Sequence, residues 1–165
     1  LKVDKRLPRR PRPEDQAALE HPVLGDLTRP LVMRRTAYPP GHHIRPHWHT
    51  RAQFAFAVAG TMRVRSARHA WIVPPSRALW LPARTVHEIQ MYGTVEMRSL
   101  YLDEGVAAAM PAACVVLEVT PLARELIVRA AALPEDYDAN GADGLLMQLL
   151  VAEIRRLPPC ALDLP

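Results

Sequence analysis

The chain has 165 residues, of which 49% are hydrophobic and 23% charged, a balance typical of a single globular domain and not of a disordered segment. It contains no run of about 18 apolar residues, so no membrane-spanning helix is predicted. Its two cysteines, Cys114 and Cys160, form neither a disulfide framework nor a metal-binding spacing, which favours a reducing, cytoplasmic location.

The net charge of +4 comes from the start of the chain. Residues 1–12 carry a net charge of +5, so the remainder is close to neutral. Residues 1–20 are therefore predicted to be a basic tail, rich in Pro and Arg and solvated. The alternative is an arm that touches nucleic-acid phosphates. No segment in the rest of the chain resembles a DNA-recognition helix.

From residue 21 onward, short apolar runs are separated by Pro and Gly, a pattern that predicts an all-β fold. Six segments read as strands: residues 31–38, 53–59, 61–65, 69–73, 77–81 and 94–103. Residues 61–65 and 69–73 are expected to form a hairpin. Residues 21–104 are predicted to form one β-barrel.

Residues 53–59 alternate strictly, with two Phe and a Val on one face and Gln53 with three alanines on the other. Because methyl groups fill little space, the alanine face is expected to leave room for a ligand inside a closed barrel. The alternative is that the alanines only make space for large side chains opposite.

Residues 105–157 are predicted to contain a final strand, residues 115–119, and then two helices. Thr120 and Pro121 provide an N-cap and a first-turn proline for a helix over residues 122–133. The second helix, residues 144–157, has more apolar positions than one buried stripe needs, which predicts a partner surface and a homodimer. The Pro-rich residues 158–165 are predicted to be a linker leading elsewhere.

Three histidines and a glutamine have the spacing of metal ligands. In an extended chain His47, His49 and Gln53 are separated by even steps, so their side chains share one face. His87 follows a turn-like segment and opens another alternating run, in which Glu88 faces the other way. Three imidazoles and one amide oxygen suit a divalent transition metal, with Zn, Ni and Fe all possible. The alternative is that these histidines are hydrogen-bonded filling of the barrel.

Since all four candidate ligands are neutral, a bound cation would keep its full charge and attract an anionic or nitrogen-donor effector. It would also be held more weakly than at a carboxylate site, and be lost as the imidazoles protonate below about pH 6. The other histidines fall outside the pattern. His42 and His43 are predicted to be loop residues, and His21 and His69 surface or structural residues.

The spacing resembles the first signature of the cupin superfamily, which is met at Gly41, His47, His49 and Gly60, with Gln53 in place of the usual Glu. The second signature is partly met. Pro82 and His87 match, whereas Ser76, Arg84 and Met91 replace two glycines and an Asn. The resemblance implies a mainly β cupin barrel (a double-stranded β-helix, or jelly roll) and a metal held by His47, His49, Gln53 and His87.

A cupin barrel followed by two helices resembles the sensor half of AraC-type transcription factors. The match covers residues 21–165 and is strongest in six segments: residues 46–53, 70–75, 77–82, 85–88, 117–122 and 152–159. It implies a dimeric regulatory domain that binds a small-molecule effector and is not an enzyme. Promoter DNA would be bound by a helix-turn-helix domain beyond Pro165, not by this chain. The competing class is a metal-dependent cupin enzyme, such as a dioxygenase or isomerase.

Overall fold

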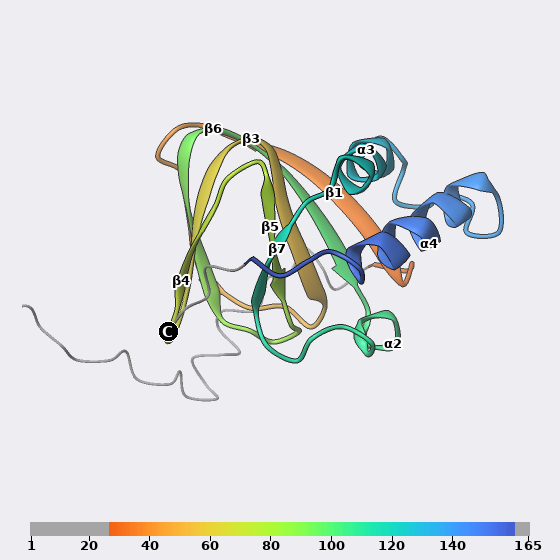
Figure 1. Cartoon of the computed structure of the whole chain (residues 1–165), viewed down its shortest axis with the longest axis horizontal. Helices are drawn as coiled ribbons and strands as arrows, with labels where there is room; N and C mark the ends of the chain where they lie inside the picture. Colours follow the sequence, from red (N-terminus) through yellow and green to blue (C-terminus); the bar gives the residue numbers. More distant parts are fainter. Residues whose placement is uncertain (1–26, 161–165) are drawn as a thin grey trace, which may run out of the picture.

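The computed structural model describes residues 27–160, which form a barrel of antiparallel strands with helices along one side (Figure 1). The tail predicted for residues 1–20 lies outside the described residues, as do residues 161–165 of the predicted linker.

Seven strands make one sheet, in the order β1-β6-β3-β5-β7, with β2 paired to β6 and β4 paired to β3. The strands are β1 (Leu31–Tyr38), β2 (His43–His47), β3 (Ala52–Ser66), β4 (Ala70–Val73), β5 (Arg77–Leu81), β6 (His87–Leu102) and β7 (Val115–Glu118). The prediction of a mainly β fold of cupin type is confirmed. The predicted hairpin is also present, because β3 and β4 pair from Met62–Val73 to Arg65–Ala70.

Two strands are longer than the sequence pattern suggests, because each continues through a glycine. β3 passes Gly60 with φ of 75°, and β6 passes Gly93 with φ of 71°. The register of the β3–β6 pair shifts on both sides of Ala59, so the ladder bulges where β3 bends. Glycine takes positive φ without steric cost, and a bulge lets a strand bend without ending. One pair of strands therefore contributes to both ends of the barrel.

Alternation along β3 divides the interior into two hydrophobic clusters. Phe54 and Phe56 face the helices and pack in a cluster that includes Leu126, Ile127 and Leu150. Residues of β3 also pack in a second cluster, inside the barrel. Its members are Ala55, Ala57, Met62, Val64, Val73, Leu79, Leu81, Ile89, Met91, Val95, Met97, Val116 and Cys160. Ala55 and Ala57 thus pack among large side chains, and Ala59 is exposed. The expectation that they leave space for a ligand is wrong.

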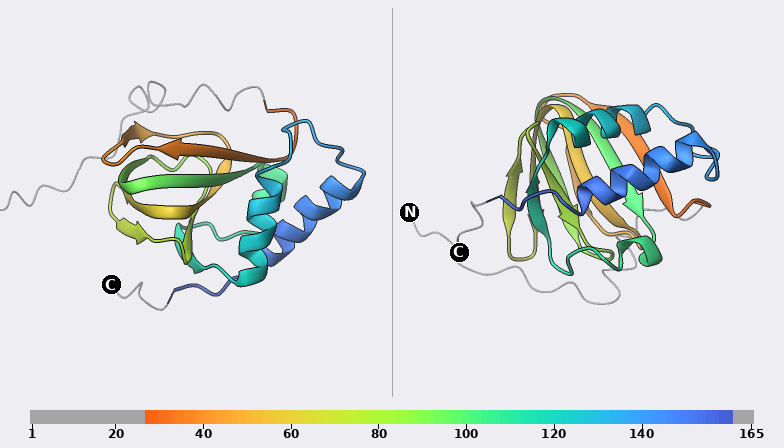
Figure 2. Two further views of the ribbon diagram at one scale, coloured as in Figure 1. Left: turned by 90° about the horizontal axis from the view of Figure 1, so that it is seen from above. Right: turned by 45° about the vertical axis from the view of Figure 1, so that its right-hand side comes forward.

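The helices α3 (Pro121–Ala130) and α4 (Ala142–Ile154) lie together on one side of the strands (Figure 1, Figure 2). A short helix, α2 (Glu104–Ala107), follows β6. As predicted, Thr120 caps α3, its hydroxyl accepting a hydrogen bond from the Ala123 amide at 3.3 Å. None of the described helices is long and apolar enough to cross a membrane.

After α4 the chain returns to the barrel. Pro159 bridges to Leu117 of β7, and the Cys160 amide donates to the Val116 carbonyl at 2.9 Å. The first residues of the predicted linker therefore lie against the last strand, which itself pairs with β5.

A substitution at Gly60 tests the bend in β3. A Cβ at Gly60 would lie 2.4 Å from the Thr94 carbonyl oxygen, whereas a Cβ at Gly93 would have nothing within 4 Å. Both residues have positive φ. Gly93→Ala is therefore expected to lower the free energy of unfolding by about 1–2 kcal/mol through backbone strain alone, and Gly60→Ala by at least about twice as much. Urea denaturation of both variants makes the comparison, and equal losses would contradict the assigned clash.

Candidate metal centre

Three of the four candidate ligands meet at one end of the barrel. His47 ends β2, His87 begins β6, and His49 lies in the connection between β2 and β3. Each offers one ligand nitrogen, and the three nitrogens lie within 4.8 Å of one another. His49 and His87 are buried, and His47 is half-buried. The segment is not one extended strand, since β2 ends before β3 begins, yet the side chains converge as the spacing predicts.

A bulge in β2 aims His47 into the barrel. Ile44 pairs with Ile89 and His47 with His87, so three steps along β2 match two along β6. The extra residue falls at Arg45-Pro46, where proline's missing N–H costs no ladder hydrogen bond. Because each step along a strand reverses the side chain, the bulge puts His47 on the same face as His42 and Ile44. Without it His47 would point outward.

Backbone carbonyls orient all three rings in the same way. The Nδ1–H of His47 donates to the Arg45 carbonyl at 2.8 Å, that of His49 to Arg51 at 2.7 Å, and that of His87 to Thr85 at 2.8 Å. A carbonyl oxygen only accepts, so each Nδ1 carries the proton and each neutral ring keeps a lone pair on Nε2. Metal-bound histidines use the same tautomer, with the non-coordinating ring N–H donating to a carbonyl or carboxylate.

Gln53 completes the donor set. Its amide Nε2 donates to the Ser99 hydroxyl at 2.9 Å, and its Oε1 lies 3.1 Å from Nε2 of His49. With Nδ1 of His49 already protonated, these two atoms face each other as lone pairs. Either a proton or a bound cation satisfies such a pair. Adjacent ligands placed about 2.1 Å from one metal ion have a similar separation. The residues present therefore fit a divalent transition metal.

A cavity of about 470 Å³ opens beside the histidines. Its wall comes mainly from β1, β2 and β6: Arg34, Thr36, Tyr38, His42, Ile44, His47, His49, Gln53, Ile89, Met97, Ser99 and Tyr101. The contribution of β1 was not predicted, although alternation along residues 31–38 places Arg34, Thr36 and Tyr38 on one face. His42 precedes β2 as a loop residue, as expected, but its ring stacks on Tyr38 at 4.9 Å and lines the cavity.

The cavity wall combines polar and apolar side chains. Among the described residues that line it, none is Asp or Glu. Burial raises the pKa of Tyr101 to about 12, and burial also raises the pKa of Tyr38, so both hydroxyls stay neutral at physiological pH. The ring of Tyr101 meets His49 edge-on, with centroids 5.5 Å apart. The cavity therefore favours a ligand with acceptor or anionic groups.

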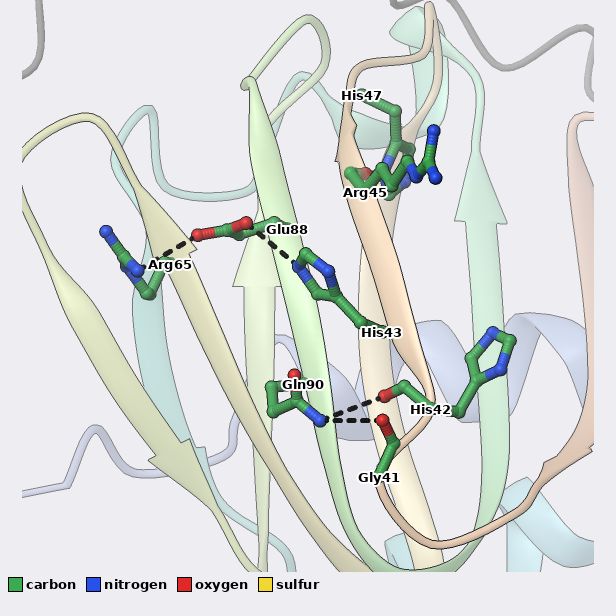
Figure 3. A network of polar contacts seen from close by, with 8 residues as sticks. All are labelled: Gly41, His42, His43, Arg45, His47, Arg65, Glu88 and Gln90. Atoms are coloured by element: carbon green, nitrogen blue, oxygen red, sulfur yellow. Dashed lines mark hydrogen bonds and ion pairs between the residues drawn. The ribbon is translucent and has the colours of Figure 1, made fainter.

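The one acid beside a candidate ligand points away, as predicted. Glu88 lies on the outer face of β6 between His43 and Arg65 (Figure 3). Nε2 of His43 donates to Glu88 at 2.9 Å, and Arg65 approaches the other carboxylate oxygen at 3.3 Å. His43 is the first residue of β2, not a loop residue. The exposed ring of His69 stacks on Trp71, in line with its predicted surface role.

A family model described as the AraC-like ligand binding domain matches residues 29–150. The HTH-type transcriptional regulator NimR of Escherichia coli K12 is 31% identical over 119 residues, which are 72% of this chain and 43% of NimR. The chain thus spans less than half the length of this curated relative.

Two solved structures of ToxT from Vibrio cholerae share the fold. Apo ToxT K231A of strain SCE256 has a TM-score of 0.60 at 5% identity, over 77% of this chain and 55% of that one. ToxT of strain O395 bound to (E)-4-(8-methylnaphthalen-1-yl)but-3-enoic acid has a TM-score of 0.58 at 4% identity, over 78% and 57%. Matched by the family model and by NimR, the chain belongs to the AraC-like ligand binding domain family.

Proposed function

We propose that this chain is the effector-sensing domain of an AraC-type transcription factor and that its effector binds in the cavity beside His47, His49 and His87. The observation that carries the proposal is the cavity itself, of about 470 Å³ and lined by both polar and apolar side chains, in a domain of a ligand-binding family. Its volume lies within the range of small-molecule sites. Structures of ToxT with an unsaturated fatty acid and with a naphthalenyl butenoic acid support a small-molecule effector for this fold.

Promoter DNA is assigned to another part of the protein. NimR is an HTH-type regulator, and the match covers 43% of it. We propose that a helix-turn-helix domain outside this chain binds DNA in the cytoplasm and that this chain controls it.

The metal is a separate proposal. His47, His49, His87 and Gln53 would hold a divalent Zn, Ni or Fe ion through neutral donors. When bound, the ion would supply a positive centre that accepts a donor atom of the effector. The chain's own residues do the rest: backbone carbonyls hold the rings, and Ser99 holds the Gln53 amide.

A metal-dependent enzyme is the weaker alternative. Such an enzyme needs a group placed for proton transfer near the metal. Glu88 faces outward, and the described residues of the cavity wall include no carboxylate. This arrangement favours binding over catalysis.

We also propose that α4 forms a homodimer. Its inner side buries Met147, Leu150 and Val151, whereas Leu145 and Leu149 are 66% and 47% exposed. The helix is therefore apolar on both sides, which a solvated helix of a monomer does not need. Two-fold symmetry also suits a regulator that binds paired half-sites in DNA.

Blocking the cavity tests the sensing role. Thr36 is exposed on β1 and lines the cavity, so Thr36→Trp should fill it without disturbing the core. In thermal-shift measurements with a panel of small carboxylates and their amides, some compounds should raise the Tm of the wild type by several degrees but not that of Thr36→Trp. Equal shifts in both proteins, or no shift with any compound, would contradict the proposal. Conversion of a stabilising compound to a product would favour the enzyme.

Elemental analysis tests the metal. Protein purified without chelator should contain close to one equivalent of Zn, Ni or Fe. His47→Ala and His87→Ala should each abolish binding, whereas Gln53→Glu should retain or tighten it by adding charge. His69→Ala is the matched control. Because imidazoles must be neutral to bind, the metal should be released below about pH 6. If the wild type is metal-free and takes up no added metal, the metal proposal is contradicted and the three histidines are only hydrogen-bonded residues that fill the barrel.

Light scattering tests the dimer. The double variant Leu145→Glu, Leu149→Glu should weaken self-association at least about a hundredfold, because it would bury charges in an apolar interface. Ile72→Glu is the control, since Ile72 is 55% exposed on β4. A wild type that remains monomeric at high micromolar concentration would refute the dimer.

A further inference from the structure

We propose that Arg34 is the anion-binding residue for the effector and that Glu135 occupies it until the effector arrives. An effector carboxylate would then replace Glu135 on Arg34 and release one contact between the barrel and the α3–α4 connection. This inference rests on the proposed sensing role of the cavity and specifies the chemical class of its ligand as a small carboxylate.

Arg34 borders two spaces at once. It lines the cavity beside the histidines, and it also lines a hollow formed with the residues that follow α3, including Ala131 and Glu135. Its side chain is 25% exposed. A guanidinium placed there can face a ligand in the cavity or a carboxylate outside it.

Glu135 already shows how Arg34 holds a carboxylate. Nε of Arg34 donates to Oε1 at 2.6 Å and Nη2 donates to Oε2 at 3.3 Å, a two-point contact. The same fork geometry recognises the carboxylate of a small ligand. Glu135 is 49% exposed, and exposed ion pairs contribute little net stability. Replacing one carboxylate by another on Arg34 therefore costs little.

The charge of the cavity selects for an anion. Arg34 is the only Lys or Arg among the described residues that line it, and none of those residues is acidic. An anion that enters therefore meets one guanidinium, which is paired with Glu135 outside the cavity wall, and no carboxylate among the described lining residues. Arg34 is therefore its natural partner, and a bound metal would add to the attraction.

The exchange is coupled to the helices because Glu135 lies in the connection between α3 and α4. Two other contacts hold this connection near β1. Tyr137 donates its hydroxyl to the Leu31 carbonyl at 2.9 Å, and Arg29 donates to the Tyr137 carbonyl at 2.9 Å. Neither Tyr137 nor Arg29 lines the cavity. Of these three contacts, only the one made by Arg34 involves a residue that a ligand in the cavity can reach.

Calorimetric titration of this chain with benzoate and with benzamide tests the binding residue. The two probes have nearly the same shape, and the cavity offers them Tyr38, Ile44 and Tyr101. Arg34→Gln should weaken benzoate binding about tenfold or more through the lost charge-assisted hydrogen bonds. Glu135→Gln should tighten it about two- to fivefold by removing the competitor. Benzamide binding should change less than about twofold in either variant.

Arg35→Gln is the control, because Arg35 is the next residue of β1, is exposed and lies outside the cavity wall. Equal affinity for benzoate in wild type and Arg34→Gln would overturn the proposal, as would no binding of benzoate by Glu135→Gln. Titrations with metal-loaded and EDTA-treated protein separate this result from loss of the metal. The sensing role itself would survive if uncharged compounds stabilise the wild type but not Thr36→Trp.

Hydrogen exchange tests the coupling. Benzoate should speed amide exchange in residues 131–137 of the wild type, and Glu135→Gln should show the faster exchange without ligand. Protection that stays the same in both cases would mean that Arg34 and Glu135 form only a structural ion pair.

Discussion

Two long strands, β3 and β6, pair along most of their length and carry Gln53, His87 and part of the cavity wall. β6 contributes His87, Ser99 and Tyr101, and β3 contributes Gln53, which reaches Ser99 across the pair. Both strands continue through glycines with positive φ, so one ladder serves both ends of the barrel. The site depends on this ladder more than on any local motif.

The site is buried and built from neutral groups. His49, Gln53 and His87 are each no more than 3% exposed, and none carries a permanent charge. Burying a carboxylate here would demand a partner charge, whereas neutral donors can be satisfied by backbone carbonyls and a hydroxyl. The same choice leaves the cavity without negative charge. We therefore expect the amide of Gln53 to change which ligands the barrel attracts more than it changes the barrel.

Strand β1 connects the two proposed functional parts of the domain, the cavity and the helices. Its outward residues, such as Leu31 and Met33, pack in the cluster beneath the helices, while Arg34, Thr36 and Tyr38 line the cavity. A shift of the β1 backbone caused by a contact on one face also moves the side chains on the other face, because both faces share one backbone. The contacts of Arg34 and Leu31 with the α3–α4 connection extend this link toward α4. In this proposal, α4 is the surface through which the domain pairs.

Local pattern in the sequence determined the β character of the barrel, the two faces of residues 53–59, the cap of α3 and the set of histidines that converge. These features follow from the two-residue period of a strand and from the preferences of cap residues, which act over a few positions. The metal itself remains a prediction. Only the tertiary structure decided where the cavity lies, because that depends on which distant side chains fill the barrel. Ala55 and Ala57 of β3 are buried in the cluster that includes Met62, Leu79 and Met97, and the space opens instead beside β1. The partnership of Arg34 with Glu135 spans 101 positions of sequence, and no local period encodes such a contact. It exists because strand pairing carries β1 beside the end of α3.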